Sequence, residues 1–261
     1  MFCEVTYKLG ATTSSRSFDL KYGTEGEAKR LEAIQIKLSG EIANYYDVYY
    51  RVHAQHFGWL GWAKNGEQAG TAGYAYRLEG IEIQLVKKTD SIPSNINFNI
   101  EPFKQERVTY STHVQDFGWQ DEVSDGQMSG TQGQAKRLEG IKIKLKNQTY
   151  KGNIEYRTHI QSYGWEDSYK KNGELSGTTG KSKRLEAIQI RLTGEMNNYF
   201  DVYYRVHAQN IGWMNWAKNG AKAGTAGYAY RLEGIEIVIV KKNTNPPTRS
   251  DINNKKAYLE K

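Results

Sequence analysis

Four short clusters of histidine, glutamine and tryptophan recur along this chain and are its best candidates for chemistry. In each cluster a His and a Gln stand two residues apart, ahead of a Gly-Trp pair. Residues i and i+2 of a β-strand point to the same face, so the two side chains would be neighbours. Gln both donates and accepts hydrogen bonds, which suits a ligand rich in hydroxyl groups. The pairs are His53 and Gln55, His113 and Gln115, His159 and Gln161, and His207 and Gln209.

A structural network is the alternative for these pairs, with the His and Gln side chains satisfying loop carbonyls under a hairpin. A zinc site is not predicted, because one His per cluster gives no local ligand set and no Cys supports it. Only the convergence of three His side chains on a symmetry axis would create one.

The tryptophans form two groups. One Trp follows the Gly of every cluster, and we expect it to fill the core beneath a tight bend, because a large aromatic ring removes much surface from water. The alternative is a stacking platform for sugar rings. A second Trp occurs in two clusters only, so the fold does not require it and it is the better platform candidate. The core candidates are Trp59, Trp119, Trp165 and Trp213, and the platform candidates are Trp62 and Trp216 with Tyr74, Tyr76, Tyr228 and Tyr230.

Carboxylates recur as well, each two residues after an Arg. We expect these charge pairs to support the structure. A glycosidase needs two carboxylates with different pKa values, whereas a symmetric array gives all its Glu similar surroundings. No nucleophile elbow, phosphate loop or metal motif is present, so we predict no catalytic residues, no cofactor and no enzyme. The residues are Glu32, Glu79, Glu139, Glu186 and Glu233.

These clusters belong to a repeated unit. The phrase Gly-Thr-x-Gly begins at residues 23, 70, 130, 177 and 224, in steps of 47, 60, 47 and 47 residues. A fixed period of this kind means that one supersecondary unit was copied along the chain. The one long step marks a break in the array.

Each unit is predicted to consist of strands. Residues 202–209 and 154–161 alternate between apolar and polar, and the end of every unit alternates in the same way. Between these stretches lies Asn-Gly or Asp-Gly, which supplies the positive φ angles of a two-residue type I′ hairpin. No apolar pattern of period 3.6 is long enough for a major helix. The chain is therefore predicted to be all-β.

The break divides the chain into two blocks. Residues 31–88 and 185–242 are identical at 45 of 58 positions, at a constant offset of 154 residues. Copying in groups of three units explains that offset, and leaves the front block without its first unit. We expect a truncated block at 1–90 (a partial unit at 1–39 and a full unit at 40–90), a linker at 91–103, a complete three-repeat domain at 104–242 and a tail at 243–261. The front block should be incomplete or marginally stable.

Three similar units favour a closed pseudo-threefold domain, because closure hides strand edges. A β-prism-like fold is favoured and a β-trefoil-like fold is the alternative. The net charge of +7 is spread over every unit instead of forming the single stripe of a nucleic-acid site, and no stretch is long and apolar enough to span a membrane. The single Cys3 excludes an internal disulfide, and residues 1–10 lack the layout of a signal peptide.

The combination Tyr-x-x-His-x-Gln, Gly-Trp, Gly-Thr-x-Gly and Arg-Leu-Glu-(Ala/Gly)-Ile, in units near 47 residues, resembles the clostridial hydrophobic-Trp (ChW) repeat over about residues 16–242. The resemblance implies a secreted or cell-surface protein of a Gram-positive anaerobe, in which such repeats are thought to bind carbohydrate or other surface partners. The expected function is a non-catalytic, multivalent module that binds polysaccharide of a bacterial or plant cell wall. A protein–protein adhesion or scaffold module is the alternative, and an enzyme is the third hypothesis.

Overall fold

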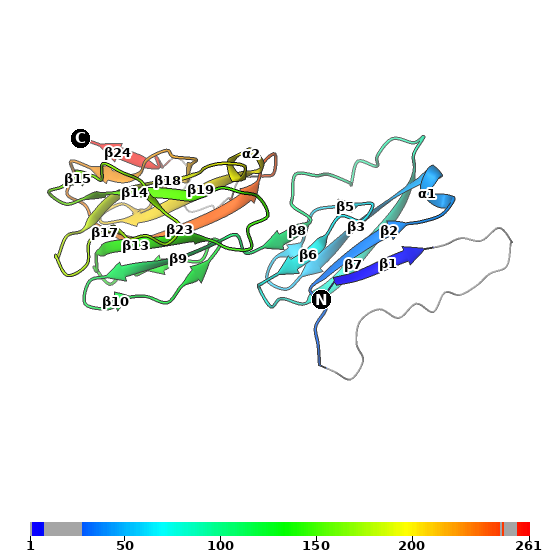
Figure 1. The fold of residues 1–261 in the computed structure, drawn as a ribbon, viewed down its shortest axis with the longest axis horizontal. Coiled ribbons are helices and arrows are strands. Elements are labelled where there is room, and N and C mark those ends of the chain that lie inside the picture. Colours follow the sequence, from blue (N-terminus) through cyan, green and yellow to red (C-terminus); the bar gives the residue numbers. More distant parts are fainter. Residues whose placement is uncertain (1, 8–27, 246, 248–254) are drawn as a thin grey trace. The chain divides into compact units, whose positions relative to one another are not determined.

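In the computed structural model the chain is all-β, with several small sheets that are mainly antiparallel (Figure 1). The structure describes residues 2–7, 28–245, 247 and 255–261, the first six by their backbone alone. It divides into a front unit, Met1–Gln105, and a rear unit, Glu106–Lys261. The described residues form two helices, α1 (Ile42–Tyr45) and α2 (Met196–Tyr199), of four residues each.

The rear unit contains three repeats, which we number three to five. Each has two long strands, two short strands that pair with the first of them, and one short strand that leaves the repeat. Repeat three contains β9 (Val108–Val114), β10 (Gly118–Trp119), β11 (Val123–Ser124), β12 (Ser129–Gly130) and β13 (Leu138–Leu145). Repeat four contains β14 (Ile154–Ile160), β15 (Gly164–Trp165), β16 (Lys170–Lys171), β17 (Ser176–Gly177) and β18 (Leu185–Leu192). Repeat five contains β19 (Phe200–Ala208), β20 (Gly212–Trp213), β21 (Ala217–Lys218), β22 (Ala223–Ala226) and β23 (Leu232–Lys241).

The strand that leaves each repeat carries the first Gly of Gly-Thr-x-Gly and pairs with the last strand of another repeat. β12 pairs with β23, β17 pairs with β13, and β22 pairs with β18. The glycine at this crossing lies very close to its partner backbone, since a Cβ on Gly224 would fall 2.5 Å from the carbonyl oxygen of Glu186. The repeated phrase therefore ties the repeats to one another.

Buried tyrosines strengthen the same connections. The Tyr110 hydroxyl accepts a hydrogen bond from the Ile237 N–H at 3.0 Å, which joins repeat three to repeat five. Tyr156 accepts one from the Ile143 N–H at 3.1 Å and donates to the Glu174 carbonyl at 2.5 Å. Burial raises the pKa of Tyr156 to about 12, since the charged form is poorly solvated there.

The predicted alternation is confirmed on the core side of these strands. Val202, Tyr204, Val206 and Ala208 are all fully buried. They pack in one cluster with the alternate residues of β23, and with residues of repeats three and four. The core of the rear unit is thus made jointly by all three repeats.

The Asn-Gly turns have the predicted backbone conformation, but the two strands that flank each turn do not pair with each other. Asn172 and Gly173 both have positive φ, at 35° and 98°, as type I′ requires. Asn65-Gly66 and Asn219-Gly220 share this geometry, whereas Asp125 does not. The turn does not close a hairpin: β16 pairs with β14, while β17 pairs with β13. That part of the prediction is wrong because the second strand pairs outside its own repeat.

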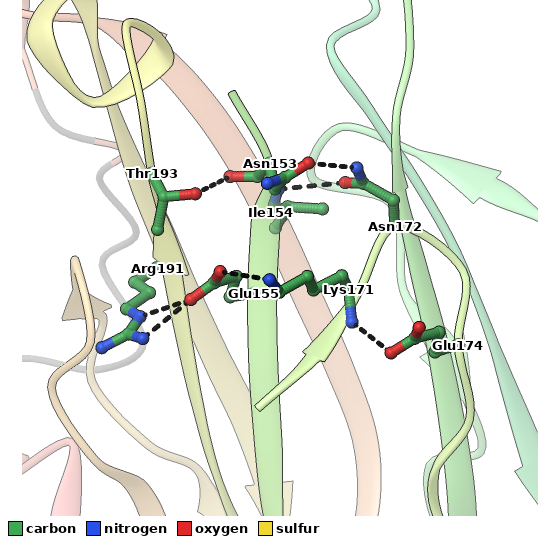
Figure 2. Close-up of polar contacts among 8 residues, drawn as sticks. All are labelled: Asn153, Ile154, Glu155, Lys171, Asn172, Glu174, Arg191 and Thr193. Atoms are coloured by element: carbon green, nitrogen blue, oxygen red, sulfur yellow. Dashed lines mark hydrogen bonds and ion pairs between the residues drawn. The ribbon is translucent and has the colours of Figure 1, made fainter. Parts of the chain in front are cut away.

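The turn Asn also holds the start of its repeat, as Figure 2 shows for repeat four. Asn172 accepts a hydrogen bond from the Ile154 N–H at 3.1 Å and donates one to Asn153 at 2.8 Å. Next to it, Glu155 accepts two hydrogen bonds from Arg191, at 2.9 and 2.7 Å. A single turn residue therefore links two segments that are 18 residues apart.

The front unit contains less of this arrangement. β3 and β7 form the long pair of repeat two, and β2 pairs with β6 as β18 does with β22. On its other side β2 meets β1 in parallel, where β18 has the antiparallel β14. The strands are β1 (Phe2–Tyr7), β2 (Ala33–Leu38), β3 (Tyr46–Ala54), β4 (Gly58–Trp59), β5 (Ala63–Lys64), β6 (Ala69–Ala72), β7 (Leu78–Lys87) and β8 (Phe103–Gln105).

A strand begins at the last residue of the predicted linker, Phe103, and another lies within the predicted tail. β8 pairs in parallel with β6, and β24 (Tyr258–Glu260) pairs in parallel with β22. Ile96 and Glu101 of the predicted linker are buried in the front unit. Each unit therefore ends in a segment that adds a parallel strand beside the Gly-Thr-Ala of its last repeat.

Candidate functional site

The candidate site is a group of four side chains that recurs in repeats two to five, here called the Trp–His–Glu cluster. It consists of the Trp of Gly-Trp, the His, the Glu of Arg-Leu-Glu and the Arg of the same phrase. Its members are Trp59, His53, Glu79 and Arg77; Trp119, His113, Glu139 and Arg137; Trp165, His159, Glu186 and Arg184; and Trp213, His207, Glu233 and Arg231.

A tight hairpin positions the Trp. In repeat three, β10 folds back on β9 so that Trp119 lies directly opposite His113. The chain turns at Asp116 and Gly118, both with positive φ, at 67° and 76°. The indole and imidazole rings meet edge to face with centroids 5.5 Å apart, a favourable aromatic geometry. The same pairing recurs in the other three clusters, at 5.5 to 5.6 Å.

The imidazole lies between the indole and a carboxylate. Nδ1 of His113 is 3.1 Å from Oε2 of Glu139, and the corresponding distances in the other clusters are 3.0 to 3.3 Å. Nδ1 makes no hydrogen bond there, so the contact is an ion pair when the imidazole is protonated. The other carboxylate oxygen accepts a hydrogen bond from Arg137 at 2.8 Å. The Arg–Glu pairs thus form as predicted, and also fix the histidine.

A cation lies over the indole ring in every cluster. The Lys142 ammonium is 4.6 Å from the Trp119 ring centroid, and the Arg157 guanidinium is 5.5 Å from that of Trp165. Arg51 and Arg205 lie over Trp59 and Trp213 at 4.9 and 4.4 Å. The cation lies on a long strand of the same repeat, which is β3, β13, β14 and β19 in repeats two, three, four and five. Each tryptophan therefore makes a cation–π contact with a long strand of its own repeat.

The expectation that these tryptophans fill the core is wrong for Trp59 and Trp119, which are 39% and 38% exposed. They lie on the polar face because the two-residue strand that carries them pairs with the His side of its neighbour. Trp165 is half-buried. Trp213 is buried, and its indole N–H donates a hydrogen bond to Gln132 of repeat three at 3.3 Å.

The two predicted platform tryptophans are less open than expected. Trp62 is 4% exposed, since it packs in a cluster with Tyr49, Val86 and Ile96 and donates to the Asn95 carbonyl at 3.1 Å. Its ring is not an accessible platform in this structure. Trp216 is half-buried, and the Arg205 guanidinium lies 5.1 Å from its centroid.

The tyrosines confined to two repeats form small aromatic groups at the hairpin tips. Tyr74 and Tyr76 stack at 5.7 Å and both contact Phe57. Tyr228 and Tyr230 lie 5.6 Å apart. All four are half-buried, so part of each ring is open to solvent.

Each His contacts the Glu of its own cluster, and the predicted ligand-binding role of the His–Gln pairs stays a prediction. The backbone N–H of each Gln donates to the carbonyl of the cluster Arg, at 2.9 to 3.0 Å, and so joins the end of the first long strand of the repeat to the start of the last one. Sequence reasoning missed the role of the Glu, although a signal was available. Glu79, Glu139 and Glu233 each follow their His by 26 residues and Glu186 follows by 27.

The described part of the chain contains no group of three or more His, Cys, Asp or Glu residues that could hold a metal ion. The histidines do not converge, because each faces the Glu of its own repeat. Among the described helices none is long and apolar enough to cross a membrane.

Comparison with known proteins identifies the repeat. The family model described as ChW, clostridial hydrophobic W, matches residues 22–40, 53–87, 113–147, 159–194 and 207–241, which is more than half of the chain. No catalytic domain is identified. No curated protein and no solved structure matches the chain.

Proposed function

The chain belongs to the ChW family, and on that premise we propose that it is a non-catalytic module that binds polysaccharide at a bacterial or plant cell surface through several weak sites. The observation that carries the proposal is the partly exposed indole of the Trp–His–Glu cluster, repeated on one kind of strand face. We propose a secreted or cell-surface location on the basis of membership of the ChW family. Fractionation of the producing cells tests that location.

The geometry suits a sugar ring. An exposed indole offers an apolar surface on which the C–H groups of a pyranose can lie. Around Trp119 stand an imidazole, a carboxylate held by Arg137 and the Lys142 ammonium. The Lys142 ammonium lies over one face of the indole, and the imidazole and the carboxylate beside the ring can donate and accept hydrogen bonds, as ligand hydroxyls require.

Repetition compensates for weak single contacts. Trp119 and Trp165 belong to the same unit, so a polymer that binds one cluster is held near the next. Such linkage raises overall affinity by roughly 10²–10⁴ without any new contact. The clusters need not bind tightly one at a time.

The test is retention of the full chain on immobilised or gel-embedded polysaccharides. Trp119→Ala with Trp165→Ala is expected to reduce retention much more than either change alone. Tyr45→Ala is the control, because Tyr45 is an exposed aromatic residue outside every cluster. Unchanged retention of the double variant, with its fold intact by circular dichroism, would contradict the sugar proposal and favour a protein–protein adhesion module.

We also propose that the rear unit is a closed pseudo-threefold body of the β-prism type. The exchange of β12, β17 and β22 among three repeats supports it, since each repeat gives one strand and receives one. An experimental structure in which one of these exchanges is absent would refute it.

A further inference from the structure

The charge beside the indole separates the four Trp–His–Glu clusters into two classes. In repeat two the cation over the ring belongs to an ion pair, since Arg51 lies 2.7 Å from Glu82, and the same pair recurs in repeat five at 2.8 Å. In repeats three and four the cation is Lys142 or Arg157. Among the residues that the structure describes, neither of these two cations forms an ion pair with a carboxylate.

The difference comes from one position on the last long strand of each repeat. Repeat three has Lys142 where repeat two has Glu82, and repeat four has Gln189 there. Gln189 accepts a hydrogen bond from Arg157 at 2.9 Å, which orients the guanidinium without neutralising it. The Arg and Glu of each cluster cancel. With the histidine neutral, the clusters of repeats three and four are therefore positively charged, whereas those of repeats two and five are neutral.

Repeats two and three offer the closest comparison, because their indoles are equally open. Trp59 and Trp119 are 39% and 38% exposed, and the cations lie 4.9 and 4.6 Å from the two ring centroids. A sugar on the exposed part of either ring would bring its substituents close to the cation. At Trp119 an anionic substituent would meet an unpaired ammonium, whereas at Trp59 the Glu82 carboxylate would repel it. The two clusters thus differ in the ligand charge that they favour and not in access to the ring.

We propose that the clusters of repeats three and four select polysaccharides that carry anionic groups, and that Lys142 and Arg157 bind those groups. Because this selection acts at the proposed sugar site, it rests on the function proposed above and names the class of sugar polymer. The carboxylate of a uronic acid and the phosphate of a polyol-phosphate chain share the required chemistry. Both accept charge-assisted hydrogen bonds from an ammonium or a guanidinium.

Retention of the full chain on gel-embedded polymers tests the selection. Polygalacturonate and its fully methyl-esterified form have the same backbone and differ in charge, so their comparison isolates the anionic group. Poly(glycerol phosphate) carries phosphate in place of carboxylate and so distinguishes the two sources. The chain should bind at least one anionic polymer more tightly than the methyl ester. That preference should fall when salt is raised from about 20 mM to about 500 mM, because salt screens exposed charges.

Lys142→Gln tests the cation of repeat three. Repeat four has Gln at this position, so the change should leave the fold intact. Affinity for the anionic polymer should fall roughly twofold to fivefold, the ratio typical of one exposed ion pair, with no change for the methyl ester. Lys144→Gln is the matched control. It removes the same charge from the same face of β13, but Lys144 is already paired with Glu122 at 2.6 Å.

Glu82→Gln tests the selection in the opposite direction. It removes the carboxylate that neutralises Arg51 and so gives repeat two the charge of repeat three. Affinity for the anionic polymer should rise roughly twofold to fivefold, with no change for the methyl ester. A merely structural role of this ion pair would not strengthen binding to one polymer, so the absence of a gain would count against the selection.

Two further outcomes separate this selection from sugar binding itself. If Trp119→Ala with Trp165→Ala weakens retention on every polymer while Lys142→Gln changes none, the indoles bind sugar and the cations do not select it. Equal losses for Lys142→Gln and Lys144→Gln would trace the effect to the net charge of +7 and refute the selection. Retention on none of the three polymers, or equal retention on all three, would also overturn it.

Discussion

The front and rear units contain nearly the same 58-residue segment in different surroundings. Residues 31–88 and 185–242 are identical at 45 positions, and both form the same strands with the same pairings. Yet Ile83 is exposed where Ile237 is buried, and Trp59 is exposed where Trp213 is buried. The difference comes from repeat three, which supplies Tyr110, β12 and Gln132 to the rear unit alone. Strand formation is thus local to the repeat, whereas burial depends on its neighbours.

The largest expected effect comes from placing a charge at the equivalent position in each unit. Ile237→Glu should destabilise the rear unit by more than about 4 kcal/mol, because it buries an unpaired carboxylate. Ile83→Glu should leave the fold of the front unit nearly unchanged. Hydrogen exchange, followed by mass spectrometry on peptides from each unit, measures both. Similar loss of protection in the two units would contradict the comparison.

The next effect concerns one ion pair present in both units. Arg205 and Glu236 lie 2.8 Å apart and are almost fully buried, whereas Arg51 and Glu82 lie 2.7 Å apart and are partly exposed. Removing one partner of a buried pair costs about 3–5 kcal/mol, so Glu236→Gln should be strongly destabilising.

Glu82→Gln should cost less than about 1 kcal/mol, since an exposed pair is screened by solvent. Urea unfolding followed by proteolytic susceptibility of each unit compares the two variants. A loss for Glu82→Gln as large as that for Glu236→Gln would contradict the expectation that burial decides how much the ion pair contributes.

A smaller difference between the two units is expected in how their stability falls at alkaline pH. Burial raises the pKa of Tyr110, Tyr156 and Tyr204 in the rear unit, to about 12 for Tyr156, and of Tyr50 in the front unit. A tyrosine with a raised pKa contributes its full stability below pH ~10 and loses it as pH rises through the folded value, at about 1.4 kcal/mol per pH unit.

With three such tyrosines against one, the rear unit should lose stability more steeply between pH 10 and 12. Thermal unfolding at fixed intervals of pH measures the slopes. Tyr156→Phe is the control, and should make the alkaline slope of the rear unit shallower. Equal slopes for the two units would be inconsistent with the burial of these hydroxyls.

The smallest difference is expected at the Asn-Gly turns, where the units agree. Asn65 and Asn219 each accept a hydrogen bond at 2.9 Å, from the Val48 and Val202 N–H groups respectively. Asn65→Ala and Asn219→Ala should each cost about 1–3 kcal/mol, because a strand N–H loses its partner. Hydrogen exchange at those two amides is the measurement. A clearly larger cost in one unit would mean that the turn is not a local feature.

Much of the fold could be predicted from short-range patterns. Period-two alternation located the long strands, and three of the four turns have the backbone that Asn-Gly predicted. The partners of the short strands could not be predicted, because β12, β17 and β22 have two to four residues and no pattern that names a partner. The segments before β8 and β24 were expected to be linker and tail for the same reason.

The sequence predicted the His and Trp of the Trp–His–Glu cluster as site residues, but it did not predict which side chains contact each other. His113 and Trp119 were singled out, but Trp119 was assigned to the core and His113 to Gln115. A single strand places residues on alternate faces, and the sequence does not reveal which face a two-residue strand such as β10 will join. Trp62 was predicted to be an exposed platform and is buried instead. Its indole N–H donates to the carbonyl of Asn95, which lies 33 residues further along the chain.

The sequence by itself determined the repeat, its strands, its turns and its membership of the ChW family, because these depend on spacing, side-chain alternation and backbone preference within about 47 residues. The tertiary structure alone decided which copies of the same residues are buried. Burial requires surface from another repeat, and identical sequences such as Ile81-Glu82-Ile83 and Ile235-Glu236-Ile237 carry no record of whether that repeat is there. For this reason the tryptophan that follows glycine is exposed at Trp59 and buried at its equivalent Trp213, which hydrogen-bonds to Gln132 of repeat three.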